Sequence, residues 1–175
     1  MPTILRSDQE IVANITCIIS DVDGVLTDGS IIYDGNGTET KHFHVHDGVA
    51  IKAWMRSGFT FAILTARNSS IVESRAKELG IQHIKQGFHD KWPAAQEILA
   101  KAGCSPENAC YIGDDLPDIA VMKRVGLSAT PADASTDARE VANWVLRQQG
   151  GRGAVRELVE RVLRAKGRWE EHLPK

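Results

Sequence analysis

The stretch Cys17-Ile18-Ile19-Ser20-Asp21-Val22-Asp23-Gly24 joins a short apolar run to two carboxylates that stand two residues apart. Side chains alternate along a β-strand, so Asp21 and Asp23 are expected to point to the same side where the chain leaves the strand. One such carboxylate can attack as a nucleophile or bind a metal, while the other transfers protons. The competing interpretation is a surface turn rich in Asp and Gly. The apolar strand before it and a second acidic cluster, Gly113–Asp118, argue against that interpretation.

Short apolar runs alternate with amphipathic stretches along the rest of the chain. The predicted strands are 15–20, 59–64, 109–112 and 127–129, and the predicted helices are 48–57, 69–79, 91–102, 117–125, 134–141 and 154–166. This alternation predicts an α/β, Rossmann-like three-layer fold with a central parallel sheet, forming one domain over 1–175 without a separate cap domain. Ligands bind such sheets at the carboxyl ends of the strands, where Asp21, Thr65 and Asp114 fall.

One segment, 30–47, interrupts the alternation. Ser30–Tyr33 and Glu39–Val45 flank the turn signal Asn36-Gly37, which predicts a β-hairpin that projects over the site. Alternate positions in its second half are histidines, which we expect to share one face of a strand: His42, His44 and His46. Three histidines on one face are able to bind a transition metal, but a polar subunit interface or the mouth of the site is the favoured interpretation.

The tail, 150–175, has a different character. Gly150-Gly151-Arg152-Gly153 precedes the last predicted helix and is expected to be flexible. The guanidinium of Arg152, on such a segment, can reach and bind an anionic group, so Arg152 is a candidate substrate contact. The alternative is a simple linker between two helices.

Composition excludes several classes of function. The 175-residue chain has a formal charge of -2, which gives no basic field for nucleic acid. No apolar run approaches the roughly 20 residues that cross a membrane, and the polar N-terminus predicts no signal peptide. The three cysteines form no Cys-x-x-Cys pair, which favours a reduced, cytoplasmic protein without a zinc site.

The polar residues at the strand ends suit phosphoryl transfer. A carboxylate nucleophile and a phosphoryl group repel each other, so the carboxylates of Asp21, Asp23 and Asp114 predict a cation. Ligands that are all oxygen favour Mg²⁺. Thr65 and Lys91 can donate to the phosphoryl oxygens. Taken alone, Lys91 is also typical of a solvated helix residue, and Thr65 of a cap for the helix after it.

In their order and spacing, Asp21–Thr27, Leu64-Thr65, Lys91 and Gly113–Asp118 resemble the motifs of the haloacid dehalogenase superfamily of aspartate-nucleophile phosphatases. The hairpin, Val45–Gly48, Gln86-Gly87 and Gly150–Glu157 narrow the resemblance to a capless branch, the 3-deoxy-D-manno-octulosonate 8-phosphate phosphatase family. The resemblance implies hydrolysis of that phosphorylated sugar acid during synthesis of lipopolysaccharide precursors. It also implies a homotetramer in which hairpins meet at the centre and neighbouring subunits help to cover each site.

The resemblance assigns roles to the matching positions. Asp21 is expected to attack phosphorus, and Asp23 to protonate the leaving oxygen and then activate water. Thr65 and Lys91 are expected to hold the phosphoryl oxygens, while Asp21, the Asp23 carbonyl and Asp114 bind Mg²⁺. Supporting roles fall to Asp118 and to Asp115, which would orient Lys91 or a metal-bound water. Contacts to the substrate are expected from Arg67, His46 and Arg152.

Two positions depart from the pattern of that family. Thr65-Ala66-Arg67 stands where the family has Thr-Gly-Arg, and Val45-His46-Asp47-Gly48 where it has Val-Arg-Asp-Gly. Histidine does not reproduce the bidentate fork of arginine, which leaves open a nine-carbon keto sugar acid 9-phosphate or another phosphosugar as substrate. Two further alternatives are a non-catalytic tetramerisation domain, which would dispense with catalytic carboxylates, and a dehalogenase, which the acidic pair Asp114-Asp115 argues against.

Overall fold

The structure is a computed structural model that describes residues 7–174. Its centre is a six-stranded parallel sheet with the strand order β5-β4-β1-β6-β7-β8. The strands are β1 (Cys17–Ser20), β4 (Thr60–Leu64), β5 (His83–Lys85), β6 (Ala109–Ile112), β7 (Leu127–Thr130) and β8 (Trp144–Val145). When the strands of this sheet are numbered along the chain, their order is 3-2-1-4-5-6, as in a Rossmann sheet. Successive strands are added on one side of β1 as far as β5 and on its other side from β6 onward. The predicted fold class is confirmed.

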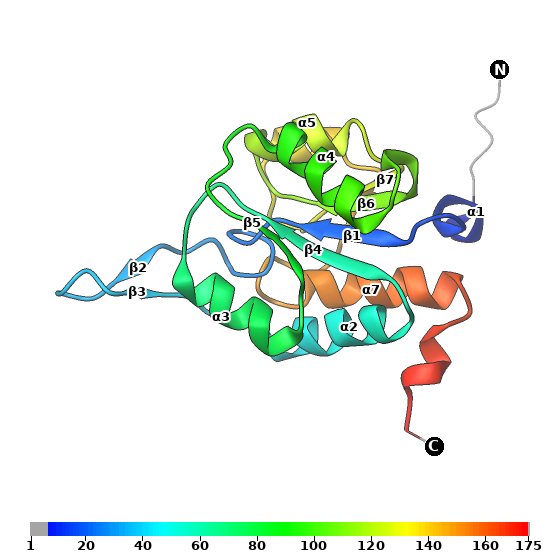
Figure 1. Cartoon of the computed structure of the whole chain (residues 1–175), viewed down its shortest axis with the longest axis horizontal. Helices are drawn as coiled ribbons and strands as arrows, with labels where there is room; N and C mark the ends of the chain where they lie inside the picture. The colour runs from blue at the N-terminus through cyan, green and yellow to red at the C-terminus, as the bar shows by residue number, and fades with distance from the viewer. Residues whose placement is uncertain (1–6, 175) are drawn as a thin grey trace.

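Helices cover both faces of the sheet (Figure 1). Below the sheet in that view lie α2 (Val45–Arg56), α3 (Ser70–Leu79) and α7 (Ala154–Ala165). The opposite face carries α4 (Lys91–Ala102), α5 (Ile119–Met122) and α6 (Thr136–Val141). The short helix α1 (Asp8–Val12) packs near α7, and 3-10 turns span Pro106–Asn108, Leu116–Asp118 and Trp169–His172. No helix among residues 7–174 is long and apolar enough to cross a membrane.

Alternation along the strands divides the core into two clusters. Ile18 and Ile112 pack with α2 and α7, whereas Ile19 and Tyr111 pack with α4. Every residue of β1 is buried, because helices cover the strand on both sides. The apolar run before Asp21 is therefore a central strand that delivers the first aspartate to the edge of the sheet.

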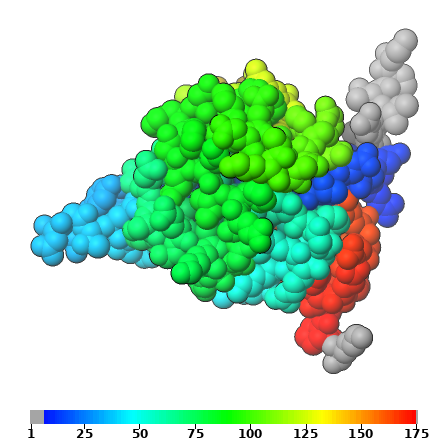
Figure 2. Space-filling model, in the orientation of Figure 1, coloured from blue at the N-terminus to red at the C-terminus, as the bar shows by residue number. Residues whose placement is uncertain are grey.

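The hairpin is formed by β2 (Ile32–Tyr33) and β3 (Glu39–Thr40), and it projects from the body of the molecule (Figures 1 and 2). Asp34 Oδ1 closes its turn by accepting hydrogen bonds from the backbone N–H groups of Asn36 and Thr38, at 2.9 and 2.8 Å. Within the described residues the hairpin is the only second sheet. Residues 1–6 and 175 lie outside the described part of the chain, so a single domain over 1–175 stays a prediction. The expected lack of a signal peptide also stays a prediction, because it concerns the same N-terminal residues.

The predicted second strand of the hairpin was too long. It ends at Thr40, and helix α2 begins at Val45, so the three histidines do not alternate along a strand. Long-range packing explains the difference: Asp47 Oδ1 accepts a hydrogen bond from the backbone N–H of Arg156 at 2.7 Å, which ties the first turn of α2 to α7. The predicted strand face therefore does not exist, although the rings of His44 and His46 lie 4.9 Å apart.

The glycine-rich segment before α7 is packed rather than flexible. The backbone N–H of Gly151 donates to the carbonyl of Val25 at 2.9 Å, and a Cβ at Gly150 would lie 1.9 Å from the carbonyl oxygen of Gly24. Gly150, Gly151 and Gly153 are buried, and only Arg152 is exposed. The segment thus supports the loop that follows Asp23.

Candidate active site

Asp21 leaves the end of β1 and lies beside a buried lysine. Its Oδ2 forms an ion pair with Nζ of Lys91 at 2.7 Å, and its Oδ1 accepts a hydrogen bond from the backbone N–H of Val22 at 2.7 Å. Lys91 is the first residue of α4, and its side chain is 1% exposed. Burial alone would lower the pKa of Lys91, but the carboxylates of Asp21 and Asp118 outweigh it and raise that pKa. The lysine therefore stays charged.

Asp118 anchors the loop that follows β6. Its Oδ1 accepts hydrogen bonds from Lys91 Nζ at 2.6 Å and from the Tyr111 hydroxyl at 2.5 Å. Its Oδ2 accepts from the backbone N–H groups of Asp114 and Asp115, at 2.9 and 3.1 Å. Asp115 was expected to orient Lys91 or a metal-bound water; its side chain is exposed, and the carboxylate that contacts the lysine is that of Asp118. The reason is local: the 3-10 turn after Asp115 carries Asp118 back under the loop.

Asp21, Asp114 and Asp118 each place one carboxylate oxygen within 4.8 Å of the others. We call these three residues the carboxylate cluster. Burial, followed by the charge of Asp118, raises the pKa of Asp21 to about 7, although Lys91 partly offsets the shift. Burial, followed by the charges of Asp21 and Asp118, raises the pKa of Asp114 to about 8. Such shifts show crowded negative charge that a divalent cation would relieve.

The donors fit Mg²⁺, with unequal roles inside the cluster. Both oxygens of Asp118 already accept two hydrogen bonds each, so Asp118 holds the loop while Asp21 and Asp114 are left to ligate. The Asp114 carboxylate also lies against the main chain after Asp23, because a Cβ at Gly24 would be 2.1 Å from its Oδ2. Asp114 thus faces the loop whose carbonyl was predicted as the remaining protein ligand.

Thr65 directly follows β4 and is buried at the opposite wall. Its backbone N–H donates to the carbonyl of Lys85 at 3.0 Å, and its Oγ1 accepts from the backbone N–H of Arg67 at 3.4 Å. No residue other than glycine has a positive φ among 7–174. Alanine at position 66, where the family pattern has glycine, therefore imposes no left-handed backbone.

These side chains surround an open pocket of about 270 Å³. Its lining comprises Asp21, Asp23, Gly29, Thr65, Ala66, Arg67, Lys91, Asp114, Asp115, Pro117 and Asp118. His46 and Arg152 are not among them: both line a separate pocket of about 720 Å³ along α7. Within one chain, the structure thus brings together all the predicted site residues except these two.

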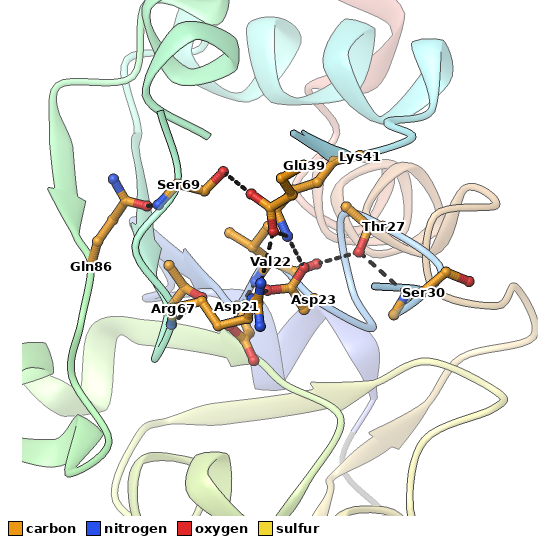
Figure 3. Close-up of polar contacts among 12 residues, drawn as sticks. Asp21, Val22, Asp23, Thr27, Ser30, Glu39, Lys41, Arg67, Ser69 and Gln86 are labelled. Atoms are coloured by element: carbon orange, nitrogen blue, oxygen red, sulfur yellow. Dashed lines mark hydrogen bonds and ion pairs between the residues drawn. The ribbon is translucent and has the colours of Figure 1, made fainter. Parts of the chain in front are cut away.

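The Asp23 carboxylate pairs with a residue at the end of the hairpin and with one from the loop after β4 (Figure 3). Its Oδ1 accepts a hydrogen bond from Lys41 Nζ at 2.5 Å, and its Oδ2 lies 3.7 Å from Nε of Arg67. Lys41 and Arg67 also pair with Glu39, at 3.2 and 2.8 Å. We call Asp23, Glu39, Lys41 and Arg67 the hairpin network. Sequence reasoning missed Glu39 and Lys41, because their i, i+2 spacing indicates only that they share one face of the hairpin.

Comparison with known proteins agrees with this geometry. A family model for haloacid dehalogenase-like hydrolases matches residues 81–158. The 3-deoxy-D-manno-octulosonate 8-phosphate phosphatases of Yersinia pestis and of Escherichia coli K12 are each 46% identical to this chain over 158 residues. In both cases the match covers 90% of this chain and 84% of the relative.

Solved structures give the same result. The crystal structure of the Yersinia pestis enzyme superimposes with a TM-score of 0.92 at 44% identity, covering 95% of this chain and 90% of the other. The phosphatase of Moraxella catarrhalis, solved in complex with magnesium ion, phosphate ion and KDO molecule, has a TM-score of 0.91 at 40% identity and covers 94% of both chains. The chain belongs to the 3-deoxy-D-manno-octulosonate 8-phosphate phosphatase family of haloacid dehalogenase-like hydrolases.

Proposed function

We propose that this protein is a magnesium-dependent phosphatase that hydrolyses 3-deoxy-D-manno-octulosonate 8-phosphate to the free sugar acid and phosphate. The observation that carries the proposal is the pairing of Asp21 Oδ2 with a buried Lys91 at 2.7 Å, inside a carboxylate cluster that opens into a pocket. A nucleophilic carboxylate, a charged lysine and an oxygen-only cation site are the three parts that phosphoryl transfer requires.

In the proposed reaction, an oxygen of Asp21 attacks phosphorus and the bond from phosphorus to the sugar oxygen breaks. Asp23 gives its proton to the leaving sugar oxygen, which leaves an aspartyl phosphate on Asp21. Water then attacks this phosphorus and passes a proton to Asp23, so that Asp21 and phosphate are released. Lys91 and Thr65 hold the phosphoryl oxygens throughout. Bound Mg²⁺ supplies positive charge that offsets the repulsion between Asp21, Asp114 and the phosphoryl group.

Recognition of the sugar acid is assigned to the rim of the pocket. Arg67 lines it with a partly exposed guanidinium, which suits the carboxylate of a keto sugar acid. His46 and Arg152 line the other pocket, and we assign their contacts to substrate that is bound in a neighbouring subunit. The complex of the Moraxella catarrhalis relative with magnesium, phosphate and KDO supports the substrate class.

A homotetramer is part of the proposal. The hairpin exposes Ile31, Ile32 and Tyr33, and the first turns of α2 expose Val45 and Val49. Apolar side chains gathered on a projecting element favour burial against further copies of the chain. Light scattering should give four times the chain mass, and a monomer at micromolar concentration would contradict the assembly. We further place the protein in the cytoplasm, because Cys17, Cys104 and Cys110 are free thiols.

The decisive experiment measures phosphate release from a panel of phosphorylated sugar acids and ordinary sugar phosphates, with and without Mg²⁺. We expect the eight-carbon 8-phosphate to have the highest kcat/KM, and chelation of Mg²⁺ to abolish turnover. A preference for the nine-carbon 9-phosphate would keep the phosphatase activity but change the assigned sugar acid, in keeping with the histidine at position 46 where the family has arginine. A tetramer inert toward every ester would revive the non-catalytic tetramerisation alternative.

A further inference from the structure

Each of the two aspartates at the end of β1 has a buried lysine of its own. Lys91 from α4 pairs with Asp21 at 2.7 Å, and Lys41 from the end of the hairpin pairs with Asp23 at 2.5 Å. Both lysine side chains are 1% exposed. Lys91 belongs to the phosphoryl site already described, whereas nothing so far assigns a task to Lys41. Because it is covered, Lys41 has no open face from which to bind substrate.

Glu39, which is itself bonded to Ser69, holds the Lys41 side chain in place (Figure 3). Its Nζ lies 3.2 Å from Glu39 Oε1, and the Oε2 of Glu39 accepts a hydrogen bond from the Ser69 hydroxyl at 2.7 Å. Arg67 Nη2 donates to Glu39 Oε1 at 2.8 Å. These bonds, with that of Ser69 first, lower the pKa of Glu39 to about 2, so it remains a carboxylate. The hairpin is thereby attached to the loop after β4, with Lys41 aimed at Asp23.

This arrangement separates two carboxylates that the sequence spacing would bring together. An extended strand would place Asp21 and Asp23 on the same side, yet Asp23 contributes no oxygen to the carboxylate cluster of Asp21, Asp114 and Asp118. A fourth carboxylate there would add repulsion and would compete for the cation. An acid/base group serves the reaction only when it is held at the leaving oxygen and the attacking water, so its direction matters.

We propose that Lys41 is a positioning residue, which holds the Asp23 carboxylate on the hairpin side of the pocket and out of the metal site. The inference rests on the proposed function. It predicts that loss of Lys41 harms the steps that need Asp23 far more than the attack by Asp21. Recognition of the phosphoryl group by Lys91 and Thr65 is left in place.

An aryl ester separates those steps. With p-nitrophenyl phosphate, Asp21 attacks phosphorus and the bond to the aryl oxygen breaks, releasing p-nitrophenolate, a leaving group that departs without a proton from Asp23. Hydrolysis of the aspartyl phosphate still needs Asp23 to accept a proton from water as the bond from phosphorus to Asp21 breaks. A misplaced Asp23 therefore leaves the first step fast and makes the second step slow.

The test compares Lys41→Met with the wild type by rapid mixing, in the presence of Mg²⁺. We expect steady-state turnover to fall about 100-fold, while the rate constant of the first phase stays within about threefold and p-nitrophenolate appears as a burst approaching one equivalent per chain. Lys41→Arg, which keeps the charge and the donors, should recover turnover to within about tenfold of the wild type. Lys85→Met removes another ion-paired lysine, the partner of Glu97, and should change turnover less than about twofold.

The outcomes separate the two proposals. A wild type that hydrolyses neither the sugar phosphate nor the aryl ester overturns the proposed function. An active wild type whose Lys41→Met variant loses both phases equally, or loses neither, overturns the role of Lys41 alone. If Lys41→Met does not fold, as judged by the absence of a cooperative thermal transition, the same measurement is made on Glu39→Gln. That variant removes the ion pair that holds Lys41 in place. Absence of a burst in that variant overturns the role.

Discussion

The carboxylate cluster and the hairpin network lie next to each other, yet their charges are arranged in opposite ways. In the cluster, Asp21, Asp114 and Asp118 share Lys91 as their one lysine, and the pKa values of the first two are raised. In the hairpin network, Asp23 and Glu39 face the two cations Lys41 and Arg67. The contrast teaches that the chain completes one region by itself and leaves the other in need of a cation, which is what a metal-assisted phosphatase requires.

Within the carboxylate cluster, loss of the nucleophile Asp21 should have the largest effect on activity. Asp21→Asn is expected to lower magnesium-dependent phosphate release by a factor on the order of 10⁴ or more, because no other group in the pocket replaces the attacking oxygen. Release is measured from the 8-phosphate at saturating Mg²⁺. Asp137→Asn, an exposed position on α6, is the matched control and should keep full activity. Turnover retained by Asp21→Asn would remove the assignment of the nucleophile.

Removing the anchor of the cluster should mainly affect stability. Asp118→Leu leaves the Tyr111 hydroxyl and two backbone N–H groups without their buried acceptor, so the free energy of unfolding should fall by about 3 kcal/mol. Urea denaturation followed by circular dichroism measures the change. A variant as stable as the wild type would show that repulsion within the cluster cancels the value of these hydrogen bonds.

Magnesium should stabilise the protein in a pH-dependent manner. The folded pKa values of Asp21 and Asp114, about 7 and 8, lie above the unfolded value, so without metal the contribution of these groups is greatest below about pH 4 and is lost as the pH rises through 7 to 8. Because Mg²⁺ binds the deprotonated carboxylates, a 100-fold excess over its Kd should raise the Tm by roughly 5–10 °C at pH 8. The rise should be smaller at pH 5.5. Equal shifts at both pH values, with EDTA as the reference, would contradict the cluster as the binding site.

The smallest effect on stability is expected in the hairpin network, where two carboxylates face two cations. Glu39→Gln should lower the free energy of unfolding by about 1 kcal/mol or less, because the Glu39 side chain is 16% exposed and solvent screens its ion pairs. The loss should shrink in 1 M salt, where exposed charges are screened. Since the pKa of Glu39 is lowered to about 2, its contribution is present above about pH 4.5 and is lost as the pH falls through 2. A loss that matches that of Asp118→Leu would erase the distinction between the two regions.

Sequence reasoning reached most residues of the active-site pocket because they follow predicted strands or begin a predicted helix. Asp21, Thr65 and Asp114 follow β1, β4 and β6, and Lys91 opens α4, so the topology alone brings them to one edge of the sheet. The two unpredicted strands, β5 and β8, contain only three and two residues and carry too little pattern for a prediction.

The hairpin network was harder to reach because it depends on the direction in which an insertion leaves the sheet. Nothing local in the sequence indicates that Lys41 returns to Asp23, or that Glu39 reaches Ser69 across 30 residues. The placement of His46 beside α7 follows from the bond between Asp47 and Arg156, which joins segments 109 residues apart. Such contacts are decided by tertiary packing rather than by local propensity.

The contact between the glycine-rich segment and the loop after Asp23 has a consequence for the order of folding. Gly151 bonds to Val25, and Gly150 touches the carbonyl of Gly24, so the loop is braced by chain that is made more than 120 residues later. During synthesis the sheet strands up to β7 can pair while this loop still lacks its support. The loop after Asp23 thus gains its full support only when the segment before the last helix docks, and a nascent chain stopped before residue 150 would carry the motif without that support.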